Sequence, residues 1–372
     1  MKRIAAFLVL LLSMCGCRQR VAEEAQAGVQ DTLEYARGLA ISHCNGYDMV
    51  KVRNPWDTLK TLRTYILIDR DREAPESLPE GTVIKVPVER AVIYTTVHAA
   101  LAEQLGAIDA IKGICETQYV SSGEIRRRID DGRIADLGLS SAPNVEKIID
   151  LEAEIIIASP FENAGYGAAE KIGVPIVEAA DYMENHPLGR SEWAKFYGLL
   201  FGKAALAREL FEATAGRYNA LKEMAAKTRT RPTLLLEKMY GSAWALPSDE
   251  SYSVQMYRDA GADYVFSGTG VRSGAPLAFE AVFDRAGEAD VWIFKYASSR
   301  DYTLSSLKDE YPLYGQFKAF KNGEVYACNT EGLPYYDDIT LHPDLILADM
   351  ISICHPELME NYQRRYYSKV SE

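Results

Sequence analysis

The longest regular alternation of apolar and polar positions lies in residues 203–227. Apolar or small side chains recur there at spacings of three and four: Leu206, Leu210, Phe211, Thr214, Tyr218, Leu221 and Ala225. This spacing is typical of an amphipathic α-helix with one buried face. At about 1.5 Å per residue, the helix would be about 38 Å long, close to the span of a small domain. The pattern predicts either a rigid helix that joins two lobes or a core helix of one large domain.

Strand-like and helix-like runs alternate on both sides of this helix. In residues 90–186, and again from Arg231 onward, short β-branched or apolar runs are each followed by a helical pattern. Such alternation is typical of a parallel sheet that is covered on both faces by helices. We therefore predict an α/β fold of two lobes, each with a mainly parallel sheet between helices, joined by one long linker helix and separated by a cleft.

An internal repeat supports the division into two lobes. The run EKIID at 146–150, followed by EAEIII at 152–157, parallels EAVFD at 280–284, followed by EADVWI at 288–293. The second copy has two additional residues before its strand, so the match is imperfect. The predicted boundaries are 46–187 for the first lobe, 188–228 for the linker helices and 229–372 for the second lobe.

Two segments before residue 90 have weaker patterns. Residues 17–45 are polar and rich in Ala, Glu and Gln, and we predict a tether that leads into a first helix or coil. Residues 46–88 contain short β-branched runs separated by Pro- and Gly-containing turns, and we predict additional antiparallel strands that flank the first lobe.

The N-terminal residues have the pattern of an export signal. Lys2 and Arg3 precede an apolar run that is too short to span a bilayer, and small residues follow it. The signal is predicted to comprise residues 1–16. Cys15 and Cys17 compete for processing; the small Gly16 favours Cys17 as the lipidated residue, and plain cleavage without a lipid is the alternative. The pattern predicts an exported bacterial lipoprotein, located in the periplasm and anchored to a membrane.

Charge and cysteine content narrow the possible partners. The 372-residue chain has a formal net charge of −12, and loss of residues 1–16 would change it to −14 because Lys2 and Arg3 are removed. So acidic a surface repels nucleic acid. The cysteines that follow Cys17 are scattered without a CxxC pair, and we expect buried thiols and name no disulfide.

Motifs that would indicate an enzyme are missing. The sequence has no Walker loop, no HExxH and no GxSxG, and Gly268-Thr-Gly270 lacks the third glycine of a dinucleotide fingerprint. Its five histidines are not clustered as zinc ligands are. We predict a binding protein with neither a resident cofactor nor a metal site of its own.

The ends of the predicted strands supply candidate ligand-binding residues. In open parallel sheets, ligands bind beyond the carboxyl ends of the strands. The chain contains 23 tyrosines, and tyrosine is frequent in these loops. Aromatic rings on both sides of a cleft would suit a large, flat, partly apolar ligand. The predicted cleft residues are Thr95, Thr96, His98, Tyr119, Phe161, Tyr166, Tyr182, Tyr240, Trp244, Tyr296, Arg300, Tyr335 and Tyr336.

An ordered set of segments resembles one known family. The segments begin with ERAVIYTTVHAALAEQLGAIDAIKGI, APNVEKIIDLEAEIIIAS and PLGRSEWAKFYGLLFGK, and continue with PLAFEAVFDRAGEADVWI and LHPDLILADMISICHPEL. Together they resemble the solute-binding proteins of ABC importers for ferric siderophores, haem and cobalamin. The resemblance covers roughly residues 85–360. It implies two α/β lobes joined by one rigid helix, a cleft that changes little on binding, and a monomer that delivers its ligand to an ABC permease and its ATPase.

The resemblance also assigns a role to the repeated glutamates. In the family, one glutamate on each lobe pairs with arginines of the permease, and the matching positions are Glu146 and Glu280. One carboxylate per lobe suits a symmetric permease dimer. The alternative is that each carboxylate only stabilises the first turn of a helix.

The ligand remains open among three kinds of metal chelate. Arg272 and Arg300 are the only evident arginines in the second lobe's loops, which is few for an anionic catecholate siderophore. Haem would need an axial ligand such as Tyr119, Tyr166, Tyr240 or His98, whereas cobalamin would need aromatic walls and few charges. A metal-cofactor enzyme and a surface binding module without a permease are the remaining alternatives.

Overall fold

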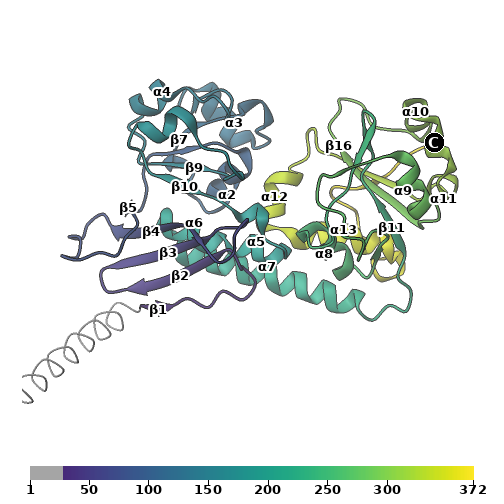
Figure 1. The fold of residues 1–372 in the computed structure, drawn as a ribbon, viewed down its shortest axis with the longest axis horizontal. Helices are drawn as coiled ribbons and strands as arrows, with labels where there is room; N and C mark the ends of the chain where they lie inside the picture. The colour runs from purple at the N-terminus through teal and green to yellow at the C-terminus, as the bar shows by residue number, and fades with distance from the viewer. Residues whose placement is uncertain (1–27) are drawn as a thin grey trace, which may run out of the picture.

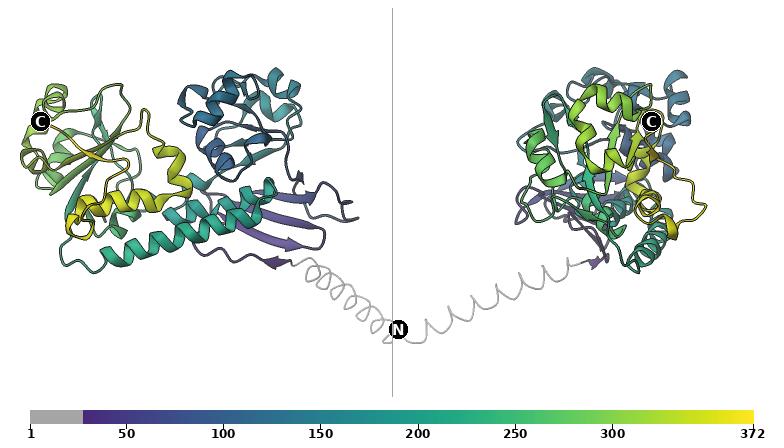
Figure 2. Two further views of the ribbon diagram at one scale, coloured as in Figure 1. Left: turned by 180° about the vertical axis from the view of Figure 1, so that it is seen from behind. Right: turned by 90° about the vertical axis from the view of Figure 1, so that its right-hand side faces the viewer.

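A computed structural model describes residues 28–372 of the chain (Figure 1). Two α/β lobes stand side by side, and the long helix α7 (Ala204–Ala225) runs beneath both of them (Figure 2). The predicted signal in residues 1–16 and the predicted lipidation site at Cys17 lie outside the described residues. In residues 28–372, no helix has both the length and the apolar character needed to cross a membrane.

The first sheet is formed by strands between residues 29 and 86, which come before the parallel sheet of the N-terminal lobe in the chain. Its strands lie in the order β1-β2-β3-β4-β5, and all neighbours are antiparallel except β4 and β5. The strands are β1 (Val29–Gln30), β2 (Leu39–Cys44), β3 (Tyr47–Arg53), β4 (Thr61–Asp69) and β5 (Thr82–Val86).

Two predictions for this region were wrong. Residues 29–44 contain β1 and β2, not a first helix, because Leu39 and Ile41 alternate as buried residues and β2 pairs along its whole length with β3. The strands of residues 46–88 are also not all antiparallel, since β5 runs parallel to β4. The Tyr65 hydroxyl of β4 connects this sheet to the parallel sheet of the N-terminal lobe. It donates a hydrogen bond to the Ile176 carbonyl at 3.1 Å and accepts one from the Glu178 N–H at 2.7 Å.

The second sheet is parallel throughout and forms the N-terminal lobe. Its order is β10-β9-β6-β7-β8. The strands are β6 (Ala91–Ile93), β7 (Ile111–Ile114), β8 (Ala135–Asp136), β9 (Ile155–Ala158) and β10 (Ile176–Glu178). Alternate residues of β9 enter two separate apolar clusters, Ile156 on one face and Ile155 and Ile157 on the other, as expected when helices cover both faces.

The C-terminal lobe repeats this plan. Its main sheet has the order β14-β11-β16-β17-β18, in which only β18 is antiparallel, and a small antiparallel sheet has the order β12-β13-β15. The strands are β11 (Thr233–Leu236), β12 (Met239–Tyr240), β13 (Ala243–Ala245), β14 (Asp263–Tyr264), β15 (Pro276–Leu277), β16 (Val291–Tyr296), β17 (Val325–Asn329) and β18 (Ser368–Lys369).

The repeat seen in the sequence occupies equivalent places in the two sheets. Helix α4 (Val145–Asp150) leads into β9, which pairs with β6, the first strand of its sheet. Helix α9 (Phe279–Ala286) leads into β16, which pairs with β11, the first strand of the other sheet. The sequence repeat therefore marks a repeated helix and strand at the centre of each lobe.

Helices complete the two lobes and the connection between them. The others are α2 (Thr96–Gln104), α3 (Gly123–Asp130), α5 (Pro187–Glu192), α6 (Ala194–Leu200), α8 (Tyr252–Asp259), α10 (Leu304–Glu310), α11 (Lys318–Lys321), α12 (Tyr335–Leu341) and α13 (Pro343–Cys354). Short 3-10 helices cover 108–110, 117–119, 167–171, 181–183, 312–316 and 356–358.

Helix α7 confirms the prediction from the periodic pattern. Ala207 packs into the core of the N-terminal lobe, whereas Phe211 and Tyr218 pack into the core of the C-terminal lobe. The helix contacts α6 near its beginning and α13 along the other lobe, and the Tyr218 hydroxyl donates to Asp259 at 2.9 Å. One continuous helix of about 33 Å therefore shares its buried face between the two lobes.

The chain before β2 is fixed to the linker region by two carboxylates. Glu192 accepts hydrogen bonds from the backbone N–H groups of residues 34, 35 and 36 at 2.8 to 3.0 Å. Glu184 accepts from those of residues 37 and 38 at 2.9 Å, and from the indole N–H of Trp193 at 2.8 Å. Because both carboxylates are buried, these bonds tie an otherwise irregular segment to α5 and its neighbours.

Candidate functional site

A cleft of about 1220 Å³ lies between the two lobes, at the carboxyl ends of their parallel strands. The N-terminal lobe contributes the start of α2 and the loop after β7, and the C-terminal lobe contributes the ends of β11, β16 and β17 and the start of α12. The cleft is lined by Thr96, Val97, Gln118, Tyr119, Val120, Ser121, Arg126, Glu237, Tyr240, Ala245, Leu246, Pro247, Ser273, Gly274, Lys295, Tyr296, Ala297, Thr330, Glu331, Gly332, Leu333, Tyr336 and Asp337.

Below the cleft, the lobes are in direct contact. Helix α12 packs against α2, and Figure 1 shows α12 between the lobes. The Ser121 hydroxyl donates a hydrogen bond across the gap to Asp337, and the Thr214 hydroxyl of α7 donates to the Leu341 carbonyl at 3.0 Å. These contacts join the two lobes directly, in addition to the covalent link through α7.

Tyrosine rings supply the largest apolar surfaces of the cleft. Tyr119 on the N-terminal lobe is 70% exposed, and on the C-terminal lobe Tyr240 and Tyr336 are 62% and 48% exposed. Tyr296 is buried apart from its contact with the cleft, and its hydroxyl donates to Asp301 at 2.9 Å. Exposed rings on both walls can cover the two faces of a flat ligand, and their hydroxyls can bond to its edge.

Most charged groups of the cleft are carboxylates or are already paired. Lys295 is paired with Glu237, whose backbone has φ of 59°, and the proximity of Glu237 holds the pKa of the Lys295 ammonium above its usual value despite burial. Burial raises the pKa of Asp337, and Glu331 adds a third carboxylate to the lining. Arg126 donates to the Val120 carbonyl and forms no ion pair with any carboxylate of residues 28–372.

Several of these residues were missed from the sequence. Glu237 directly follows β11 and could have been found from the carboxyl-end rule, whereas Lys295 lies within β16 and Arg126 within α3. Of the residues that were predicted for the cleft, the structure places Thr96, Tyr119, Tyr240, Tyr296 and Tyr336 in its lining. Arg300 is exposed and lies outside that lining, as does Tyr335, which is buried against Tyr366 and Tyr367.

The placement of Trp244 in the cleft was wrong. Its side chain is fully buried, its indole N–H donates to the Leu236 carbonyl at 2.9 Å, and its ring packs against Trp292 and Phe317. Trp244 pairs with Met239 in the β12–β13 hairpin, so both face the core while Tyr240 faces the opposite way.

Thr95 and His98 form part of a buried polar chain between the lobes. The Thr95 hydroxyl lies 2.7 Å from His98 Nδ1, and His98 Nε2 lies 2.9 Å from Asp181. Asp181 also accepts from Arg190 Nε at 3.0 Å, and Arg190 donates onward to the Tyr252 hydroxyl of the C-terminal lobe at 3.2 Å. Burial alone would raise the pKa of Asp181, but His98 and the Arg190 guanidinium lower it overall. His98 therefore has structural partners on both ring nitrogens and lies outside the cleft.

The three remaining candidates lie at a different part of the same sheet edge. Phe161 and Tyr166 follow β9 and line a separate pocket of about 370 Å³, and Tyr182 lies beside Phe161 with ring centroids 6.1 Å apart. The carboxyl-end rule led to all of them, but β9 and β10 lie beyond β6, on the side of the sheet opposite β7.

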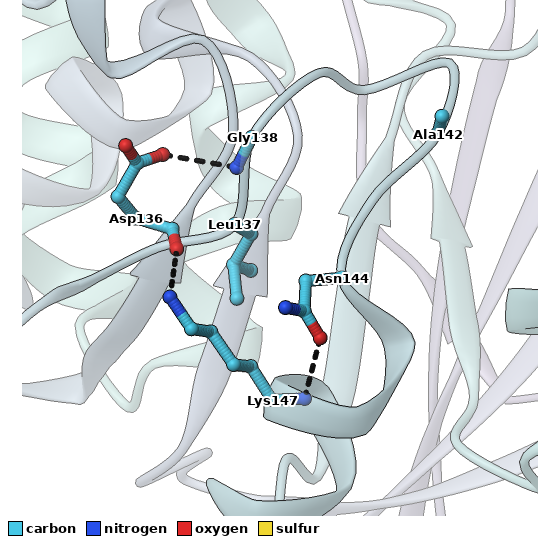
Figure 3. Close-up of a pocket in the computed structure, with 6 residues that line it drawn as sticks. All are labelled: Asp136, Leu137, Gly138, Ala142, Asn144 and Lys147. Carbon is cyan, nitrogen blue, oxygen red and sulfur yellow. Dashed lines mark hydrogen bonds between the residues drawn. The ribbon is translucent and has the colours of Figure 1, made fainter.

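Glu146 and Glu280 are both exposed in the first turn of their helices. At the start of α4, Asn144 accepts from the Lys147 N–H at 3.0 Å, and Lys147 Nζ donates to the Asp136 carbonyl at 3.1 Å (Figure 3). A hollow of about 510 Å³ lies there, lined by Asp136, Leu137, Gly138, Ala142, Asn144 and Lys147. Since Asn144 already caps α4, the Glu146 carboxylate is not needed as the cap.

A resident metal site is not evident in the part of the chain that the structure describes. Among residues 28–372, no group of three or more His, Cys, Asp or Glu side chains is arranged to hold a metal ion. Cys115 and Cys328 are buried thiols, and burial raises the pKa of each to about 12.

The fold and the cleft define a class: a two-lobed solute-binding protein whose lobes are joined by one long helix. The sequence matches the family model described as periplasmic binding protein over residues 91–331, and the chain belongs to this family. The predicted resemblance and the predicted fold class are confirmed.

Related proteins agree with this assignment. An uncharacterized lipoprotein of Methanocaldococcus jannaschii is 29% identical over 327 residues, which cover 83% of this chain and 76% of that protein. Among solved structures, a periplasmic haem-binding protein from Pseudomonas aeruginosa has a TM-score of 0.59 at 14% identity, covering 76% of this chain and 98% of that chain. The TroA-like periplasmic binding protein FepB from Veillonella parvula has a TM-score of 0.58 at 15% identity, covering 77% and 96%. At these identities the structural matches support the fold.

Proposed function

We propose that this protein is the substrate-binding lipoprotein of an ABC importer, which captures an iron complex in the cleft and delivers it to a permease in the membrane. The observation that carries the proposal is the cleft itself, with exposed tyrosine rings on both walls. Its volume exceeds the roughly 300–1,000 Å³ of ordinary small-molecule pockets, which suits a large chelate. The solved relatives include proteins whose names specify haem binding and ferric hydroxamate transport.

The charges of the cleft favour a complex of low net charge. Three carboxylates and two basic groups line it, and one of the basic groups, Lys295, is already paired with Glu237. A multiply charged catecholate complex would meet these carboxylates with little compensation. A neutral ferric siderophore, or haem with a propionate near Arg126 and a tyrosine hydroxyl toward the iron, fits the same groups better.

Cobalamin is the alternative ligand, because the cleft also has aromatic walls and few uncompensated charges. Binding is favoured over a metal-cofactor enzyme because the chain belongs to the periplasmic binding protein family. A surface module without a permease is disfavoured by the exposed glutamate at the same place in each lobe, Glu146 and Glu280, which we assign to permease docking.

We further propose that residues 1–16 are removed and that Cys17 carries the lipid, so that a monomer is held at the membrane on the periplasmic side. The names of two relatives as lipoproteins support this anchoring. The ATPase would act through the permease and not through direct contact with this chain.

A titration of the soluble form, residues 18–372, tests the ligand class. Haemin, a neutral ferric hydroxamate, an anionic ferric catecholate and cyanocobalamin are added while intrinsic fluorescence is recorded. We expect saturable quenching by one low-charge complex at micromolar affinity or tighter. Tyr119→Ala should weaken that affinity, whereas Phe161→Ala, an exposed ring outside the cleft, should not. Absence of saturation by all four ligands would contradict the proposal.

A further inference from the structure

A second pocket lies outside the cleft, where the β1–β5 sheet meets the N-terminal lobe. It has a volume of about 370 Å³. The connection between β3 and β4 forms one wall, and the residues that follow β9, together with the end of β10, form the other. Tyr65 of β4 is bonded to β10 at this junction, so the two walls are fixed to each other. Five of the twelve residues that line the pocket therefore precede the family match at 91–331.

Aromatic rings dominate the apolar part of this pocket. Trp56 is partly exposed and faces it from one wall, and Phe161, which is 64% exposed, and Tyr166 line it from the other. The Tyr166 hydroxyl is buried and has no hydrogen-bond partner among residues 28–372. A ligand in the pocket would cover the exposed Phe161 ring together with Trp56 and Tyr166, three aromatic side chains gathered in one concave place.

The charges around these rings are negative overall. Arg63 pairs with the buried Glu178 at 2.8 Å, and Lys60 pairs with Asp57 at 2.7 Å. These two pairs compensate two of the carboxylates that line the pocket. Glu162, next to Phe161, forms no ion pair within the described residues. The pocket thus combines three aromatic side chains with one carboxylate that is not ion-paired within the described residues.

We propose that this second pocket binds a small organic cation, a tertiary or quaternary ammonium compound. The faces of Trp, Phe and Tyr rings carry negative potential and attract such a cation, and recognition of quaternary ammonium groups by aromatic side chains rests on this attraction. Glu162 supplies the countercharge. The acidic chain as a whole also favours approach of a cation. A neutral saccharide would use the same rings but would gain no ionic attraction from the exposed Glu162 carboxylate.

The test compares choline with 3,3-dimethylbutan-1-ol, which has the same shape without the charge. Isothermal titration with residues 18–372 should show saturable binding of choline, and the uncharged alcohol should bind at least ten-fold more weakly. Equal binding of both compounds, preference for a neutral sugar such as glucose, or no binding of choline at millimolar concentration would overturn the proposal.

Tryptophan fluorescence locates the binding. Trp193, Trp244 and Trp292 are fully buried, so Trp56 is the tryptophan of the four that acrylamide can reach directly. Choline should protect Trp56 from acrylamide quenching, and this protection should be absent in Trp56→Phe. Unchanged quenching at saturating choline would place the cation elsewhere and overturn the assignment.

Variants separate the roles of charge and ring. Glu162→Gln and Phe161→Ala should each weaken choline binding about five-fold or more, and both side chains are exposed, so folding should be unaffected. Glu331→Gln, a cleft carboxylate, is the matched control and should leave choline binding unchanged. Weakening by the control variant alone would show that choline enters the cleft instead. The cleft and the second pocket share no residue. Tyr119→Ala should therefore weaken chelate binding and leave choline binding unchanged, so the two proposals can fail separately.

Discussion

The two lobes have the same central strand order but are filled with different side chains. In the N-terminal lobe, β6 and β9 pack Ile and Val against Ala and Leu of the covering helices. In the C-terminal lobe, the equivalent strands pack around Trp292 and Trp244, with Phe279, Phe317 and Tyr314 beside them. Trp292 stands at the position that Ile156 has in the first copy of the repeat.

This difference shows which features the repeat has kept. Strand order, a helix that begins with an exposed glutamate, and a ligand-facing carboxyl edge occur in both lobes. The identity of the core side chains does not need to match, because the volume and apolar character of the filling determine packing. The following predictions test how far the lobes are equivalent.

The largest effect should come from Trp292→Ala. Its ring is fully buried, and its indole N–H donates to the Glu237 carbonyl at 2.7 Å, at the floor of the cleft. Loss of the ring should lower the free energy of unfolding by about 3–5 kcal/mol. At the equivalent position of the other lobe, Ile156→Val removes only one methyl group and should cost about 0.5–1.5 kcal/mol. Urea denaturation measures both, and similar losses would contradict the contrast between the cores.

The connection between the lobes should be the next most sensitive. Asp181→Asn leaves the buried Arg190 without its countercharge and should cost about 3 kcal/mol of unfolding free energy. The folded-state pKa of Asp181 lies below its unfolded value, so its stabilisation is present above the unfolded pKa and is lost as pH falls through the folded pKa. The stability difference between wild type and variant should therefore shrink below about pH 4. A difference that grows in acid would show that the pair does not stabilise the folded protein.

Ligand binding should depend on both walls to a similar degree. Tyr119→Ala and Tyr336→Ala remove one exposed ring from each lobe, and each should weaken binding of the low-charge chelate about ten-fold, since an aromatic contact contributes roughly 0.5–1.5 kcal/mol beyond the area it buries. Fluorescence titration measures both affinities. Loss confined to the Tyr336 variant would mean that the ligand sits on the C-terminal lobe alone.

The smallest effects should come from the exposed glutamates. Glu146→Ala and Glu280→Ala should each weaken docking to the permease about two- to five-fold, as exposed ion pairs do, and the double variant should combine both losses. Uptake into proteoliposomes that contain the importer measures docking, with chelate affinity unchanged in all three variants as the control. Normal uptake by the double variant would remove the proposed docking role.

The sequence predicted those elements whose signal is local. Helix α7 was predicted at 203–227 and occupies Ala204–Ala225, because one apolar stripe runs along its whole length. The first two strands were missed although β2 and β3 form a hairpin across the two-residue turn Asn45-Gly46, which is a local hairpin signal that the prediction overlooked. β1 has no such signal, because its two residues pair only with β2, more than ten residues away along the chain. Alternation within β12 and β13 does distinguish outward Tyr240 from buried Trp244, and the prediction overlooked it.

The site was predictable only in part, because a cleft is made by two lobes. The carboxyl-end rule finds the correct edge of a sheet but does not say which portion of that edge faces the other lobe, so it also selected Phe161, Tyr166 and Tyr182. Lys295 and Arg126 carry no sequence signal, since their relevance depends on how α3 and β16 are placed across the gap. The docking role of Glu146 and Glu280 and the lipid at Cys17 stay predictions.

The carboxylates of Glu184 and Glu192 give the chain a defined path for mechanical force. A pull on the N-terminal side would first separate the two residues of β1 from β2, one hydrogen-bonded pair at a time. The load would then reach five backbone N–H groups that are held side by side by two buried side chains, and these bonds would be stretched together. Tension would therefore pass into α5 and the residues just before it, and not into the parts of the lobes that carry the cleft tyrosines.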